Sequence, residues 1–287
     1  MEAQRKSLWE LNAAVLLWAG TALFAKWIPL PPFQITGLRA IAAAGILLLL
    51  LLARGQEVRV RNRRDLVILI VSGLAMAAHW ITYFQAIQVS TVAIGILALH
   101  SYPVMTALAE PLWFRERFKA ADVLLAVVVA IGLAVLVPRF TLESRVLQGT
   151  LWGVLSAVFF TTRNLLTRQL IGNHGSGKIT FYQLAATAVA LFPVVITAGE
   201  RIELASALKL LLLGTMFTAL PHTLYTKALQ HLSARSAGII STLLPIYGAV
   251  AAALLLGEMP TSRTVVGGAI VLTAVTLETW RTLRARR

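Results

Sequence analysis

The chain has 287 residues, of which 58% are hydrophobic and 13% charged, with a mean hydropathy of +0.77. Since a soluble domain carries roughly 25% charged residues, this composition predicts a polytopic membrane protein, and the absence of cysteine excludes disulfides, thiolate metal sites and thiol nucleophiles. The net charge of +14 does not indicate nucleic-acid binding. The basic residues lie near the ends of apolar runs, where they orient a membrane protein and meet anionic lipid headgroups.

The apolar runs predict ten membrane helices, because about 20 apolar residues are needed to cross a bilayer. The first run lacks a small-residue cleavage site, so we expect a retained helix and not a signal peptide. Pro29, Pro31 and Pro32 separate the first two helices. The expected helices lie near residues 9–28, 32–53, 65–88, 91–113, 120–138, 148–170, 178–198, 206–229, 234–256 and 262–282.

The distribution of Lys and Arg predicts the orientation. With the N-terminus inside, the cytoplasmic side holds 18 of the 26 Lys and Arg residues and the outer side holds six. This excess predicts that both termini are cytoplasmic.

The stretch from His79 to Glu116 recurs 142 residues later without a gap. Tyr83, Pro103 and Glu116 correspond to Tyr225, Pro245 and Glu258, and helix two recurs at a spacing of 144, which pairs Arg39 with Gln183. We therefore expect two five-helix repeats, residues 1–140 and 145–287, within one transmembrane unit that acts as a monomer. Because five is odd, the second repeat enters the membrane inverted, as in alternating-access carriers with a central substrate site.

His79 and His100 lie at equal distances from the turn near Val89–Ser90. That distance is about 16 Å of helix, or half the hydrocarbon thickness. Imidazoles at this depth need water, a partner or a ligand. Both a pocket and an inter-helix hydrogen bond fit this pattern. Tyr83 follows His79 by four residues and shares its helical face.

Proline in the centre of a helix removes a backbone donor, so Pro103 predicts local unwinding that brings His100 and Tyr102 to one cavity. Pro245, next to Tyr247, predicts the same in the second repeat. We interpret these two prolines as kink or gating positions.

Trp18 is expected at the middle of its helix and corresponds to Phe160 in the repeat. Its side chain either lines a pocket or only packs against neighbouring helices. Arg163 is expected about five residues from the inner end of its helix, where it either reaches the headgroups or receives a substrate carboxylate. The full set of predicted substrate-binding residues is His79, Tyr83, His100, Tyr102, Trp18, Phe160, Arg163, Tyr225 and Tyr247.

The patterns from Pro103 to Glu116 and from Pro245 to Glu258 resemble those of the drug/metabolite transporter superfamily, EamA type. Within it the chain is most similar to the YddG-type exporters of aromatic amino acids, on the His79/Tyr83 face and Trp18. The resemblance implies an inner-membrane bacterial exporter of aromatic and other neutral amino acids, with no cofactor or metal. Export of drugs or other metabolites is the alternative.

An enzyme and a channel are competing interpretations. His79 and His100 have no third ligand expected at their depth for a metal, and no Gly-x-Ser-x-Gly motif is present. Saturable flux would argue against a channel.

Overall fold

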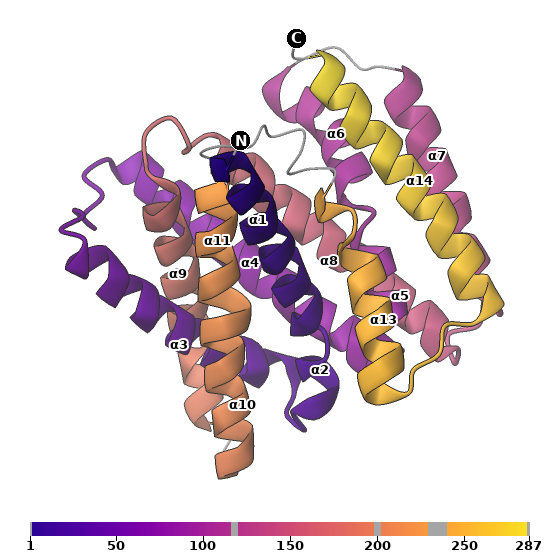
Figure 1. Cartoon of the computed structure of the whole chain (residues 1–287), viewed down its shortest axis with the longest axis horizontal. Coiled ribbons are helices and arrows are strands. Elements are labelled where there is room, and N and C mark those ends of the chain that lie inside the picture. Colours follow the sequence, from indigo (N-terminus) through magenta and orange to yellow (C-terminus); the bar gives the residue numbers. More distant parts are fainter. Residues whose placement is uncertain (1, 116–119, 198–201, 229–239, 286–287) are drawn as a thin grey trace.

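The computed structural model describes residues 2–115, 120–197, 202–228 and 240–285. Every regular element within these ranges is a helix, and the helices form one bundle (Figure 1). The helices are α1 (Glu2–Thr21), α2 (Phe24–Trp27), α3 (Pro32–Ala53), α4 (Arg63–Val89), α5 (Val92–Leu99), α6 (Tyr102–Phe114), α7 (Ala120–Leu136), α8 (Arg145–Arg168), α9 (Ser176–Thr197), α10 (Leu204–Gly214), the π-helix η1 (Thr215–Ala219), α11 (Leu220–Ala228), α13 (Leu244–Leu256) and α14 (Ser262–Ala285).

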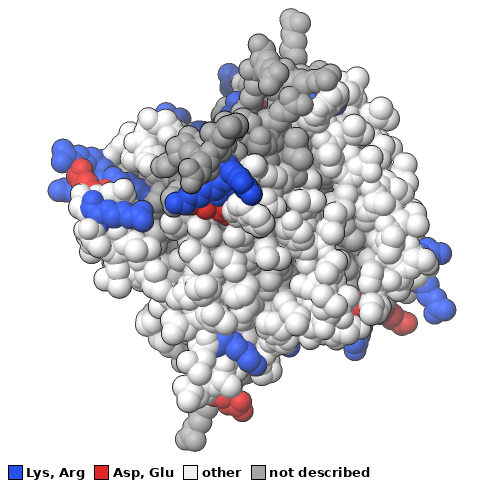
Figure 2. Space-filling view, in the orientation of Figure 1, with Lys and Arg blue, Asp and Glu red and all other residues white. Residues whose placement is uncertain are grey.

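Six segments of the described chain are long and apolar enough to cross a membrane. The helices α7 and α13 are apolar but shorter, whereas α8 and α14 have 24 residues each and more polar side chains. In Figure 2 the charged residues gather toward the two ends of the bundle, and the face between them is almost free of charge. The six segments are Arg5–Trp27, Pro32–Ala53, Arg63–Val89, Val92–Phe114, Ser176–Thr197 and Leu204–Tyr225.

The helices of the two sequence repeats are interleaved. The helix α4 packs against α8 and α9, α3 packs against α9, and α1 packs against α11. Helices α7 and α14 lie side by side at the edge of the bundle (Figure 1). The start of α1 and the end of α14 lie at the same end of the molecule (Figure 1). The centre of the bundle is therefore built by residues from both repeats.

A glycine of α4 brings its backbone close to α9. A Cβ atom added to Gly73 would lie 2.6 Å from the Cβ atom of Ala186 and 2.8 Å from the carbonyl oxygen of Gln183. Only glycine permits this approach without movement of the neighbouring helix.

The same contact recurs between α10 and α3. A Cβ atom added to Gly214 would lie 2.8 Å from the Cβ atom of Ala42 and 3.0 Å from the carbonyl oxygen of Arg39. Ala42 and Arg39 stand 144 residues before the two partners of Gly73. Equivalent residues of the two repeats thus make equivalent contacts.

The π-helix η1 interrupts the helix expected at residues 206–229. Gly73 and Gly214 are 141 residues apart, whereas Tyr83 and Tyr225 are 142 apart. A π-helical turn inserts one extra residue into a helix, and η1 lies between these two pairs. The helix expected near residues 206–229 is present as the continuous run of α10, η1 and α11, and the sequence has no simple signal for the π-turn inside it.

Both proline-containing helices are broken near their prolines. Residues His100 and Ser101 separate α5 from α6, and Pro103 is the second residue of α6. Pro245 is likewise the second residue of α13, and a turn precedes that helix. The expected helix 234–256 begins outside the described residues.

The first membrane helix is also broken, which the sequence analysis did not predict. Residues Ala22 and Leu23 separate α1 from α2, and their amides donate to carbonyls three residues earlier. The hydroxyl of Thr21 donates to the carbonyl of Phe217 at 3.1 Å. Residues 22 and 23 are neither proline nor glycine, so these two positions carry no local signal for the break. The hydrogen bond from Thr21 to Phe217 lies directly beside it.

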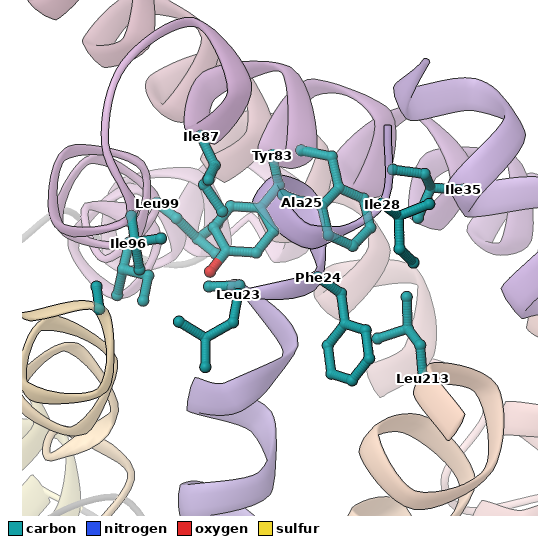
Figure 3. Packing of buried hydrophobic residues seen from close by; sticks show 14 of the residues in the cluster. Leu23, Phe24, Ala25, Ile28, Ile35, Tyr83, Ile87, Ile96, Leu99 and Leu213 are labelled. Atoms are coloured by element: carbon teal, nitrogen blue, oxygen red, sulfur yellow. The ribbon is translucent and has the colours of Figure 1, made fainter. Parts of the chain in front are cut away.

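The largest buried cluster of the described residues joins α2 and the residues that flank it to α3, α4, α5, α8, α10 and α13. Figure 3 shows the Tyr83 ring within this cluster, with its hydroxyl directed between Leu23 and Leu99, and the Phe24 ring beside Leu213. The side chains fill the bundle on the side where α2 and the turn between α4 and α5 meet.

Candidate functional site

His79 is held by a serine on another helix. Its Nδ1 atom lies 2.7 Å from Oγ of Ser156 on α8, and that hydroxyl lies 2.8 Å from the carbonyl oxygen of His79. A hydroxyl has one proton, and a carbonyl can only accept, so Ser156 donates to the carbonyl and accepts from Nδ1–H. Neutral His79 therefore keeps Nε2 as a hydrogen-bond acceptor.

Aromatic rings surround His79. The ring of Phe160 lies 4.7 Å away between centroids, and the ring of Tyr83 is stacked at 6.1 Å. Tyr102 packs edge-on against Phe160, also at 4.7 Å. The structure thus brings four of the predicted residues into one contiguous group.

His100 lies in the break between α5 and α6. Its Nδ1 atom is 2.8 Å from the carbonyl oxygen of Ile96, so Nδ1 carries the proton and Nε2 is again an acceptor. His100 contacts the ring of Tyr102 at 5.9 Å. The described contacts of His79 and His100 are with different partners, so the structure does not pair the two imidazoles with each other.

A cavity of about 130 Å³ lies between the two helix breaks. Its walls combine a histidine and two tyrosines with hydroxyl groups from the second repeat. The lining residues are His100, Tyr102, Pro103, Tyr225, Ser241, Thr242, Val275 and Thr279. Both repeats contribute to this cavity. A second, larger hollow of about 400 Å³ lies at the proline-rich turn around Pro29 and Pro31 and contains none of the predicted site residues.

A second aromatic group faces this region from α1 and α11. Trp18 lies 5.1 Å from the ring of His222 and 5.2 Å from that of Tyr225. The sequence analysis did not single out His222. The residue 142 positions after His79 is Pro221, so a search at that spacing misses this histidine by one position.

Tyr247 lies farther along the same side of the bundle. Its hydroxyl donates to Oδ1 of Asn12 at 3.3 Å, and its ring packs against the buried cluster of Leu11, Val15 and Ala228. It connects α13 to α1 and does not line the cavity between the helix breaks.

Arg163 is turned inward and does not extend to the headgroups. Its Nε and Nη2 atoms both donate to Oε1 of Gln183, at 3.1 and 2.7 Å. The amide nitrogen of Gln183 donates in turn to the hydroxyls of Ser72 and Thr167. Neutral groups thus orient this cation, which leaves it available to an anion.

At one end of the bundle a charged residue from each repeat forms an ion pair. Lys26 lies 3.3 Å from Oε1 of Glu258 and donates to the carbonyl of Ser90 at 2.8 Å. The other carboxylate oxygen of Glu258 accepts from the amide of Val92, the first residue of α5. A carboxylate at a helix N-terminus is favourable because the first amides there have no partner within the helix. This network ties together α2, α5 and the segment after α13.

The opposite end has a different ion pair, between Arg168 at the end of α8 and Glu110 of α6. Within the described residues no three His, Asp or Glu side chains lie close enough to hold a metal ion.

The sequence pattern of the EamA-like transporter family matches residues 8–137 and 147–280. The chain belongs to the EamA-like transporter family. Such transporters form the EamA type of the drug/metabolite transporter superfamily, as the sequence analysis expected.

Several EamA-like relatives have names that describe export. Pseudopaline exporters from two strains of Pseudomonas aeruginosa are 31% identical over 252 residues and 28% over 245, in each case over 85% of both chains. A probable terminal-alkyne amino-acid exporter of Streptantibioticus cattleyicolor is 25% identical over 293 residues, which cover 98% of this chain and 96% of the relative. A solved crystal structure aligns with 100% of this chain and 99% of its own, with a TM-score of 0.67 and 20% identity. That likeness shows the fold alone.

The family and the apolar helices make this protein a multi-pass membrane protein. The family indicates that this protein is a transporter.

Proposed function

We propose that this EamA-like transporter exports amino acids, aromatic and other neutral ones, by alternating access through a central cavity between its two repeats. In this proposal ten helices cross the bacterial inner membrane, residues 1–140 and 145–287 form inverted repeats, and both termini are cytoplasmic. The chain acts as a monomer. The observation that carries the proposal is the cavity lined by His100, Tyr102 and Tyr225 at the helix breaks of both repeats.

The polar groups of this region fit a zwitterion. The Nε2 atoms of His79 and His100 are acceptors that suit an ammonium group, because both Nδ1 protons are already donated. Arg163, held only by neutral groups in the described structure, suits a carboxylate. Trp18, Phe160 and the tyrosines offer apolar surface for a side chain.

The closed end of the bundle supports alternating access. Lys26 and Glu258 join the two repeats at that end, and the cavity at the helix breaks measures about 130 Å³. Ligand sites usually measure about 300–1,000 Å³, so an amino acid requires this cavity to widen. The equivalent contacts of Gly73 and Gly214 support two repeats that rock against each other at matched glycine contacts.

Export of drugs or other metabolites is the second candidate. The relatives named as pseudopaline exporters favour it, since they are similar over 85% of this chain. The relative named as an amino-acid exporter favours the first candidate.

Flux into proteoliposomes tests the proposal. We expect saturable uptake of labelled phenylalanine, threonine and methionine, accelerated by unlabelled amino acid on the other side of the membrane. His79→Ala and Tyr83→Ala should abolish this uptake without lowering the amount of protein inserted. An absence of amino-acid flux in the wild type would leave the export of other metabolites as the better proposal. Full flux in both variants would show that the site has been wrongly placed.

A further inference from the structure

Arg39 is a buried cation that the proposed site does not use. Its side chain lies on α3 and is 3% exposed. A charged group in the membrane interior is costly and usually has a function.

The contacts of Arg39 leave most of its donors unpaired. Nη2 donates to the hydroxyl of Thr218 at 3.0 Å, while Nε and Nη1 have no hydrogen-bond partner. The guanidinium lies over the indole of Trp80, with its Cζ atom 3.7 Å from the ring centre. An aromatic face attracts the charge but accepts no hydrogen bond from the edge of the guanidinium, so two donors are left for another group.

The partner of Arg39 is itself a special feature of the fold. Thr218 lies in the π-helix η1 and is fully buried. Its hydroxyl donates to the carbonyl of Leu213, five residues earlier, at 2.7 Å and accepts from Arg39. A π-helical turn is costly and often occurs at a functional site. Here it places a hydroxyl oxygen against the guanidinium.

No carboxylate neutralises this cation in the part of the chain that the structure describes. The ion pairs there involve Glu57, Asp65, Glu110, Asp122, Glu258 and Glu278, and none of them includes Arg39 or Arg163. Arg39 lies 5.4 Å from the ring of Phe84, and Arg163 lies 5.6 Å from the ring of Phe160. Phe84 belongs to the largest buried cluster and Phe160 packs against it, so two guanidinium groups without a carboxylate partner among the described residues border the same aromatic region.

The two arginines lie toward opposite ends of the bundle. Arg39 is seven residues from the start of α3, about 10 Å from the end closed by Lys26 and Glu258. The start of α8 is at that same end, because Gly149 packs against Ser90. Arg163 is five residues from the far end of α8, about 8 Å from the opposite end of the bundle.

We propose that Arg39 is a second binding residue for the substrate's carboxylate, on the side of the pathway nearer the Lys26–Glu258 closure. Arg163 receives the carboxylate from the opposite side, and Arg39 holds it through its free donors when the closed end opens. A guanidinium offers Nη2 with Nε, or Nη2 with Nη1, as a two-pronged donor that matches two oxygen atoms. Thr218 accepts one of the two Nη2 protons, so one of these pairs stays free for a carboxylate. This inference rests on the proposed function, since it assigns a second contact to the same substrate.

Transport of matched substrates tests the role of Arg39. The probes are labelled phenylalanine and phenylalaninamide, which differ at the carboxylate. In Arg39→Gln we expect phenylalanine flux to fall at least tenfold and amide flux to change less than threefold. Arg39→Lys, which keeps the charge but not the two-pronged geometry, should lie between wild type and Arg39→Gln. Arg59→Gln, which removes an exposed arginine, is the matched control and should change neither flux.

Thermal unfolding in detergent tests the same contact without transport. Acetate should raise the Tm of the wild type more than acetamide does, and this difference should be clearly smaller in Arg39→Gln, in which only Arg163 remains for the anion. Equal losses of amino-acid and amide flux, with a lowered Tm and no acetate effect in the wild type, would overturn the proposal and make Arg39 a packing residue on Trp80. Wild-type protein that carries no amino acid but shows the Arg39-dependent acetate effect would overturn the proposed function and leave the anion site standing.

Discussion

Ser156 and His79 exchange hydrogen bonds between α8 and α4. The serine hydroxyl donates to the histidine carbonyl, and the imidazole Nδ1–H donates to the serine oxygen. Both residues are at most 5% exposed. The pair therefore fixes which ring nitrogen of His79 faces the aromatic region, and it does so from the other repeat.

Removing this serine should weaken transport by loosening the imidazole. In Ser156→Ala, Nδ1 loses its partner, and we expect the affinity for amino acids to fall about tenfold, which corresponds to about 1.4 kcal/mol. The lost buried hydrogen bond should also lower the unfolding free energy by about 1 kcal/mol. Uptake kinetics and thermal unfolding measure the two effects. Thr162→Ala removes an exposed hydroxyl from the same helix and should change neither, whereas equal behaviour of the two variants would contradict the role of Ser156.

The closed end should open when Glu258 is shortened. Glu258→Ala loses the contact with Lys26 and the cap on Val92, while Glu258→Gln keeps an oxygen for the cap. Because the chain has no cysteine, a single Cys in place of the buried Ile28 reports access by a membrane-impermeant thiol reagent. We expect labelling to rise about fivefold in Glu258→Ala, or about 1 kcal/mol, and less in Glu258→Gln. Unchanged labelling in both variants would rule out a closing role.

The two glycine contacts should respond alike to an added methyl group. Gly73→Ala and Gly214→Ala place a Cβ atom within 2.6–3.0 Å of a neighbouring helix, and we expect each to lower the unfolding free energy by about 1–3 kcal/mol. Gly45 has nothing within 4 Å of an added Cβ atom, so Gly45→Ala should be neutral or stabilising by up to about 1 kcal/mol. Thermal unfolding in detergent compares the three. If Gly45→Ala were equally destabilising, the losses in Gly73→Ala and Gly214→Ala would not come from contact with a neighbouring helix.

Trp18 should select for aromatic side chains. Its ring lies within 5.2 Å of both His222 and Tyr225, so Trp18→Ala removes a large apolar surface beside the proposed pathway. We expect phenylalanine flux to fall at least fivefold, about 1 kcal/mol, while threonine flux changes little. Competition between the two substrates in proteoliposomes measures this selectivity. Equal losses of phenylalanine and threonine flux would show that Trp18 only packs against its neighbours and does not select the substrate.

The candidate site was partly predictable from residue types. His79 and Tyr83 were predicted from buried polarity and helical spacing, Tyr102 from the unwinding expected at Pro103. Phe160 was predicted from its correspondence with Trp18 in the repeat. The structure brings His79, Tyr83, Tyr102 and Phe160 together. The partners Ser156 and Gln183 were not predictable as such, because serine and glutamine are common in helices and only helix packing decides what they face. Arg39 and His222 were not among the predicted binding residues. Their significance depends on unpaired donors and on neighbours from other helices.

The sequence by itself determined the class of this protein and its repeated pattern. Apolar length decides which segments can cross a membrane, and that property is local and additive along the chain. Prolines at equivalent positions predicted local unwinding for a similarly local reason, since each removes a backbone donor. These features can be predicted without knowing which residues lie next to each other in the folded protein.

Only the tertiary structure decided the breaks that carry no local signal, the π-helix η1 and the break at Ala22 and Leu23. η1 packs against α1 and α3, and Thr21, directly before the break, donates to the carbonyl of Phe217 in η1. The tautomers of His79 and His100 and the open donors of Arg39 depend on atoms from other turns or helices. Such properties arise from the assembled bundle, because hydrogen-bond partners are assigned by distance in space and not along the chain.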